Sequence, residues 1–253
     1  KSSAASDVYK RQIFHMDLNT EKYDTRESLD SILNFTLEKW EQQYGTAPSE
    51  TTFALRFRGL IERAYEQTGQ RVVILIDEYD KPMLQAIGNE ELQKEFRNTM
   101  KAFYSVLKTM DGCIQFAFLT GVTKFGKVSV FSDLNNLDDI SMRKQYVDLC
   151  GVSEKELHDD LEIELHELAD IKGVSYHEIC DKLREYYDGY HFTHNSIGIY
   201  NPFSLLNTFK YKEFGSYWFE TGTPTYLVEL LKKHHYDLRR MAHEETSISV
   251  LNS

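Results

Sequence analysis

Apolar residues along the chain fall into short unbroken runs, separated by longer stretches that have the features of helices. Strands are predicted at three apolar runs, residues 13–18, 72–77 and 114–119. Helices with capping residues or helical apolar spacing are predicted between them, at residues 26–44, 51–68 and 90–110. This alternation is typical of an α/β fold in which a parallel sheet lies between two layers of helices, three layers in all. One more short strand is expected at residues 137–141.

The pattern changes at about residue 142, and the remaining chain favours short helices. Ser153 and Ser175 each precede a glutamate by three residues, so capping boxes are predicted to open helices at 154–170 and 176–187. Asn201 precedes a proline, which favours the first position of a helix, and Thr223 does the same. The pattern therefore predicts two parts. They are an α/β core at 13–145 and a helical region at 146–253, whereas residues 1–12 resemble a translated adaptor and are set aside.

Composition narrows the possible functions without naming one. The chain has 253 residues and a formal net charge of −11, which argues against a general nucleic-acid or membrane-surface footprint. Its three cysteines are widely spaced, so they indicate neither a disulfide framework nor a zinc ribbon, and a cytoplasmic location fits best. No apolar run approaches the length that spans a bilayer.

Residues 71–80, RVVILIDEYD, carry the strongest chemical signal, because five aliphatic residues end in two adjacent carboxylates. A strand of this kind is typical of the centre of a parallel sheet, and ligands bind beyond the carboxyl ends of such strands. The run reads as a Walker B strand. In nucleoside triphosphatases with this motif, the first carboxylate holds Mg²⁺ and the next glutamate polarises the attacking water. Asp77 and Glu78 are the candidates. The alternative is that they only end a strand before a turn.

The segment after the third predicted strand nearly matches a phosphate-binding loop. Residues 121–128 fit the spacing G-x-x-x-x-G-K-[ST] except at the last position, where Val128 stands in place of the hydroxyl that binds Mg²⁺. A sensor strand beside Walker B is the preferred interpretation. Thr120 or Thr123 would then lie near the γ-phosphate. Possible cationic contacts to the phosphates come from three residues, Lys124, Lys127 and Arg143. The alternative is a solvated loop with incidental lysines.

Five motifs together resemble the bacterial AAA-ATPase-like family, and they span about residues 13–240 in the expected order. The motifs are LIDEYD (75–80), LTGVTKF (119–125), FSDLNN (131–136), YDGYHF (187–192) and YNPFSLL (200–206). The resemblance implies a P-loop NTPase of the additional-strand class, with a three-layer sheet of order 5-1-4-3-2 and a helical lid region. The three predicted strands would be strands 2, 3 and 4 of that order. Strand 1 and the phosphate loop would precede this chain, leaving an unpaired apolar edge, and a nuclease-like domain would follow it.

The resemblance implies Mg²⁺ and ATP as ligands, with Asp77 holding the metal through water and Glu78 as the catalytic carboxylate. Asn201 and Pro202, or the Gly222-Thr-Pro224 turn, would supply a lid contact to adenine. Arg239 and Arg240 could serve a neighbouring subunit of a homo-oligomer or could simply end a solvated helix.

Three alternatives to an ATPase stay open at this stage. One is a nucleotide-sensing or interaction module with little turnover. A metal-nuclease centre is weaker, because the required Asp followed by Glu-x-Lys is absent. A zinc site could also pair His177 and Cys180 with His191 and His194.

Overall fold

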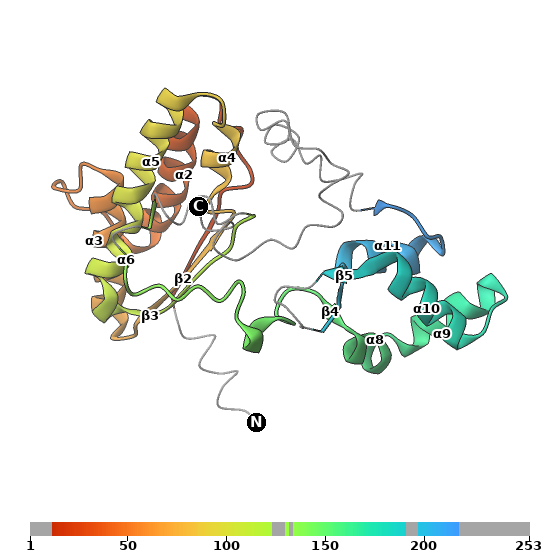
Figure 1. Cartoon of the computed structure of the whole chain (residues 1–253). Helices are drawn as coiled ribbons and strands as arrows, with labels where there is room; N and C mark the ends of the chain where they lie inside the picture. The colour runs from red at the N-terminus through yellow and green to blue at the C-terminus, as the bar shows by residue number, and fades with distance from the viewer. Residues whose placement is uncertain (1–11, 123–129, 132–133, 191–196, 218–253) are drawn as a thin grey trace. The chain divides into compact units, whose positions relative to one another are not determined.

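A computed structural model describes residues 12–122, 130–131, 134–190 and 197–217. The chain divides into two compact units, with the boundary between Leu137 and Asp138 (Figure 1). The first unit contains a parallel sheet and its helices, and the second contains short helices with a small antiparallel sheet.

The sheet of the first unit has three parallel strands in the order β1-β2-β3. The strands are β1 (Ile13–Asp17), β2 (Val72–Asp77) and β3 (Ile114–Leu119). Met16 of β1 and Leu119 of β3 both pair in register with Ile76 of β2. All three strands lie where the apolar runs predicted them, and β2 is central as expected.

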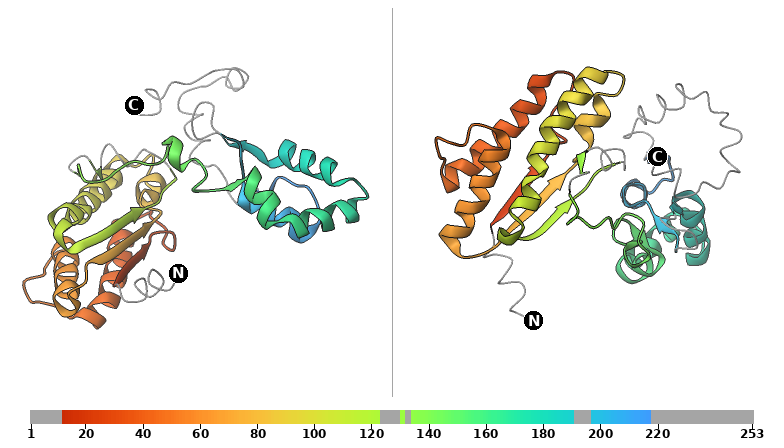
Figure 2. Two further views of the ribbon diagram at one scale, coloured as in Figure 1. Left: turned by 90° about the horizontal axis from the view of Figure 1, so that it is seen from below. Right: turned by 60° about the vertical axis from the view of Figure 1, so that its left-hand side comes forward.

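The helices of this unit cover one face of the sheet (Figure 2). They are α2 (Arg26–Tyr44), α3 (Phe53–Thr68), α4 (Lys81–Gln85), α5 (Glu90–Tyr104) and α6 (Val106–Thr109), followed by the 3₁₀ turn η1 (Asp111–Cys113). Thr52 caps α3 through the Leu55 N–H, and Asn89 caps α5 through the Leu92 N–H. The helix predicted over 90–110 is interrupted at Ser105, the residue that separates α5 from α6.

Buried aromatic side chains join this helical layer to the sheet. Phe14 of β1 contacts Trp40 of α2 with ring centroids 4.8 Å apart, and Phe57 of α3 stacks on Phe103 of α5 at 4.6 Å. Phe14, Phe57 and Phe103 are at most 1% exposed. Removing a buried aromatic ring of this kind typically costs about 3–5 kcal/mol, so the cluster is a principal source of stability in this unit.

The opposite face of the sheet has no helical layer among the described residues, so the third layer of the expected fold stays a prediction. Within the described residues, the helices lie on one face only, and the other face carries Val73 and Leu75 as half-buried side chains. Ile13 and Phe116, on the same face, are 48% and 54% exposed. The unbroken aliphatic run predicted burial on both faces. A face of the sheet is buried only where another layer covers it, and the described helices cover one face.

The second unit begins with the 3₁₀ turn η2 (Lys144–Tyr146). Its helices are α8 (Glu154–Asp160), α9 (Glu162–Lys172), α10 (Tyr176–Tyr187) and α11 (Pro202–Tyr211). Both predicted capping boxes are present, since Ser153 and Ser175 each accept a backbone N–H and bond to the glutamate three residues on. The helix predicted at 154–170 is broken at Leu161, which separates α8 from α9.

Two features of the chain after residue 137 differ from the sequence prediction. Residues 137–141 form no strand, and the Ser141 N–H instead donates to Asp139 Oδ1 at 3.0 Å in a local turn. A small antiparallel sheet, not predicted, has the order β4-β6-β5 and consists of β4 (Val152–Ser153), β6 (Ile199–Tyr200) and β5 (Asp188–Tyr190). The helix start at Asn201 is confirmed, whereas Thr223 lies outside the described residues.

Candidate functional site

The carboxyl ends of β2 and β3 bring two of the predicted site residues together. Asp77 is the last residue of β2, and Thr120 directly follows β3. The Thr120 hydroxyl donates a hydrogen bond to Asp77 Oδ1. The backbone fixes this arrangement, because the Thr120 N–H donates to the Ile76 carbonyl at 2.9 Å and the Tyr79 N–H donates to the Thr120 carbonyl at 2.9 Å. Neighbouring parallel strands end at one edge of a sheet, which is why these two residues meet.

Glu78 follows Asp77 in an unusual backbone conformation. Its φ angle is 56°, in the left-handed region that residues other than glycine seldom adopt. Its N–H donates to Asp77 Oδ1 at 3.0 Å. Partial burial, and then the charges of Asp80 and Asp77, raise the pKa of the Glu78 carboxyl above its ordinary range. The Glu78 carboxyl therefore has more affinity for a proton than a free glutamate.

Two further carboxylates lie at the same edge, and sequence reasoning assigned neither of them a role. Asp17 ends β1 in register with Asp77, and its Oδ1 accepts the Asn19 N–H at 2.7 Å. Asp80 is 1% exposed, and its Oδ1 accepts the Val122 N–H at 3.1 Å. Their position in the sequence could have identified them, since each stands at or just after the end of a predicted strand.

The remaining predicted site residues fall into two groups. Thr123, Lys124 and Lys127 lie outside the described residues. Arg143 and the Asn201-Pro202 pair belong to the second unit. There Arg143 forms an ion pair with Asp138, and Asn201 Oδ1 accepts the Ser204 N–H at 2.9 Å as the cap of α11. Their roles at a nucleotide stay predictions.

The donor set at Asp77 suits magnesium better than zinc. Across the described ranges, no three His, Cys, Asp or Glu side chains converge to hold a metal directly. His177, proposed above as a zinc ligand, instead contacts Asp181 Oδ2 through Nδ1 at 2.9 Å. Mg²⁺ usually keeps several waters and takes one or two carboxylates together with substrate phosphates. Asp77 is exposed and oxygen-bearing, so it fits that requirement.

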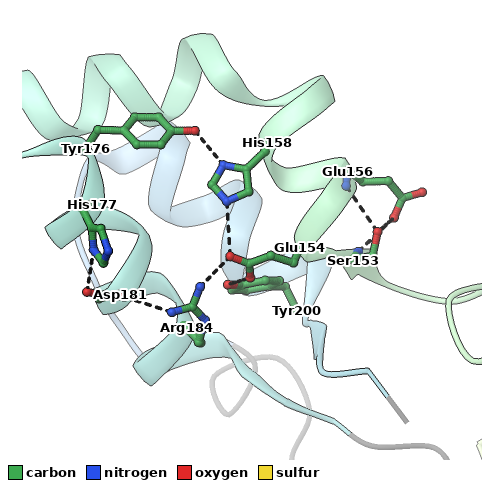
Figure 3. A network of polar contacts seen from close by, with 9 residues as sticks. All are labelled: Ser153, Glu154, Glu156, His158, Tyr176, His177, Asp181, Arg184 and Tyr200. Atoms are coloured by element: carbon green, nitrogen blue, oxygen red, sulfur yellow. Dashed lines mark hydrogen bonds and ion pairs between the residues drawn. The ribbon is translucent and has the colours of Figure 1, made fainter.

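A second polar cluster, which sequence reasoning missed, joins three elements of the second unit (Figure 3). Glu154 of α8 accepts hydrogen bonds from Tyr200 of β6 at 2.5 Å and from Arg184 of α10 at 2.6 Å. His158 Nε2 lies 3.3 Å from Glu154 Oε1, and its Nδ1 lies 2.7 Å from the Tyr176 hydroxyl. Burial and the hydrogen bond to Glu154 raise the pKa of Tyr200, so Tyr200 keeps the proton that it donates.

The helical layer of the first unit carries a groove of about 580 Å³. Its walls include Arg26 and Asn34 of α2, and Thr52 and Arg56 near the start of α3. Arg56 binds Glu41 at 2.7 Å and Asn34 at 2.5 Å, so its guanidinium is already engaged. None of the residues that line this groove belongs to the edge at Asp77. The edge at Asp77 is therefore the better candidate site.

The first unit is thus an α/β core with carboxylates and a hydroxyl gathered at the carboxyl edge of a parallel sheet, where folds of this class bind ligands. A family model described as "Predicted AAA-ATPase" matches residues 2–131, about half of the chain, and the chain belongs to this AAA-ATPase-like family. The resemblance inferred from the motifs is confirmed. The match begins inside the segment 1–12 that was set aside, and that division stays a prediction.

The chain is also similar to a curated protein from Azotobacter chroococcum mcd 1, described as "Uncharacterized protein in vnfD 5'region". The two are 44% identical over 191 residues, which is 76% of this chain and 35% of the relative. This chain therefore spans about a third of the length of that relative. No solved structure matches the chain. Within the described residues, no helix is both long enough and apolar enough to cross a membrane.

Proposed function

We propose that the intact protein binds Mg-ATP at the carboxyl edge of its parallel sheet and hydrolyses it in the cytoplasm. Membership of the predicted AAA-ATPase family supports the proposal that the ligand is ATP. The single observation that carries the proposal is the hydrogen bond between Thr120 and Asp77, which joins the ends of two neighbouring strands. In the proposal, β2 is the Walker B strand and β3 is the sensor strand. The lid contacts of Asn201 and Pro202, the phosphate contacts of Lys124, Lys127 and Arg143, and a contribution from Thr123 belong to the same proposal.

Asp77 would hold Mg²⁺ through water in this scheme. Its Oδ1 is oriented by the Thr120 hydroxyl and the Glu78 N–H. A carboxylate that is held in place loses less freedom when it binds a hydrated ion. When bound, Mg²⁺ would neutralise charge that develops on the phosphate oxygens. Thr120 would lie near the γ-phosphate, at the end of the adjacent strand.

Glu78 would orient the water that attacks the γ-phosphate. Its carboxyl is half-buried, and its raised pKa makes it a better proton acceptor than an exposed glutamate. The left-handed backbone at Glu78 turns the chain directly after Asp77. Asp77 and Glu78 would therefore take separate roles although they are adjacent in the sequence. The step needs no covalent intermediate on the protein.

The test is Glu78→Gln in the full-length protein. We expect turnover of ATP to fall about 100-fold or more, because removal of a general base typically costs this much, while ATP still binds. Glu62→Gln is the matched control, since Glu62 is an exposed glutamate of α3. Steady-state turnover and equilibrium binding of ATP are measured for both variants. Unchanged turnover in Glu78→Gln would refute the assigned role.

A nucleotide-sensing switch with little turnover is the second candidate. The Thr120–Asp77 hydrogen bond favours it, because a γ-phosphate that binds the Thr120 hydroxyl would compete with Asp77 for that donor. The same measurements separate the two candidates. Tight binding of ATP without hydrolysis in the wild-type protein would select the switch.

A further inference from the structure

Asp80 is a buried carboxylate at the candidate site for which the proposed mechanism has no role. It occupies the N-cap position of α4, yet its side chain makes no capping hydrogen bond to that helix. Its Oδ1 instead accepts the Val122 N–H at 3.1 Å, just beyond the end of β3. Burial of a carboxylate is costly unless hydrogen bonds compensate it. The contact with Val122 therefore matters for keeping Asp80 in its buried position.

Gly121 allows this close approach. A Cβ atom at residue 121 would lie 2.6 Å from Asp80 Oδ1 and 2.7 Å from Tyr79 Cε1. Contacts this short are not tolerated, so any larger residue would push the segment after β3 away from Asp80 or displace both side chains. Glycine is required at residue 121 because there is no space for a side chain there. The short distance from Asp80 to the Val122 N–H depends on this glycine.

The same short segment after β2 also contacts the chain further on. The Tyr79 ring lies 4.9 Å from the Phe131 ring, and Phe131 lies 5.2 Å from the buried Tyr104 of α5. Residues 79 and 80 therefore hold the chain at Val122, shortly after it leaves β3, and again at Phe131. Both contacts come from residues that lie two and three positions after Asp77 in the sequence.

We propose that Asp80, Gly121 and the Val122 N–H form a latch that keeps the Thr120 hydroxyl on Asp77. Thr120 is the residue between β3 and this latch, and its carbonyl already accepts the Tyr79 N–H. Asp80 is thus a positioning residue that acts through Thr120. The inference rests on the proposed function, in which Thr120 and Asp77 work together, and it adds a determinant of their geometry.

The test compares Asp80→Ala, Asp80→Asn and Gly121→Ala in the full-length protein. We expect Asp80→Ala and Gly121→Ala to lower kcat for ATP by about 10- to 100-fold with little change in KM, the range typical for residues that orient a metal-binding carboxylate. Asp80→Asn should retain most of kcat, because its amide oxygen can still accept the Val122 N–H. Asp170→Ala, an exposed aspartate on α9, is the control.

A double variant separates positioning from general destabilisation. If Asp80 acts through Thr120, Asp80→Ala should add little to the loss in kcat that Thr120→Ala causes alone. If the loss in kcat of the double variant equals the product of the two single losses, the proposal is overturned. A fall in melting temperature with unchanged kcat in Asp80→Ala would also overturn it.

Hydrogen exchange without nucleotide tests the latch independently of turnover. The Val122 amide should exchange faster in Asp80→Ala and in Gly121→Ala than in the wild type, and at nearly the wild-type rate in Asp80→Asn. Unchanged exchange in both of the first two variants would refute the latch. An absence of ATP binding and turnover in the wild type would refute the proposed function instead, so the two failures are distinguishable.

Discussion

At the residue scale, the carboxylate of Glu154 is shared by three partners in the second unit, Tyr200, Arg184 and His158. Its partial burial acts to raise its pKa, but the hydrogen bonds from Tyr200 and Arg184 outweigh this effect, so the pKa lies below its ordinary value of 4.5. A carboxyl with a lowered folded-state pKa stabilises the fold above its unfolded pKa. That contribution is lost as the pH falls through the folded-state pKa.

We therefore predict that acidification below about pH 4.5 destabilises α8 and α10 more in the wild type than in Glu154→Gln. Hydrogen exchange of peptides from α8 and α10, followed as a function of pH in the full chain, measures this difference. Glu185→Gln, an exposed glutamate of α10, is the control and should follow the wild type. Equal acid sensitivity in the wild type and Glu154→Gln would contradict the prediction.

Some site residues could be predicted from the sequence because a local pattern marks their position. Others could not, because their role depends on a contact with a residue far away in the sequence. Asp77 ends one recognisable strand and Thr120 directly follows another, and parallel strands place such ends at one edge. Asp80 accepts the backbone N–H of Val122, which is 42 residues away in the sequence. Glu154 depends on Tyr200, 46 residues away, on a two-residue strand. No local pattern specifies contacts of this kind.

At the scale of elements, the capping boxes show how local sequence fixes a helix start. The Ser153 side chain accepts the Glu156 N–H, and Glu156 bonds back to the Ser153 N–H at 2.9 Å. We predict that Ser153→Ala lowers the free energy of unfolding by about 1 kcal/mol, the usual loss for a helix cap. Urea unfolding of the full chain, followed by the helical circular dichroism signal, measures it. Ser49→Ala, at an exposed serine in the turn between α2 and α3, should have no comparable effect.

The elements that sequence placed correctly are those with strong local signals. Periodic helices, aliphatic strands and capping boxes identify themselves within a few residues. The breaks at Ser105 and Leu161 do not, because both lie inside longer helical patterns. The strands β4 and β6 have two residues each, too few to show alternation. Their pairing comes from tertiary contacts in the second unit.

At the scale of the molecule, the first unit exposes an apolar sheet face beside an edge strand. The Phe116 and Phe118 rings stack with centroids 6.1 Å apart on β3, which has a strand neighbour on one side only in the described sheet. Phe116 is 54% exposed and Ile13, on the same face, is 48% exposed. Contiguous apolar surface and an unpaired edge both favour association with another chain.

We predict that the chain studied by itself self-associates through this face, and that Phe116→Lys shifts it towards monomer. A lysine on an edge strand opposes pairing, because its charge would be buried in the contact. Phe35→Lys is the matched control, since Phe35 is 68% exposed on α2, away from the sheet. Sedimentation velocity over a range of concentrations gives the molecular mass of each variant. A wild-type chain that stays monomeric and melts cooperatively would contradict the prediction, because its exposed sheet face would then need no cover from another surface.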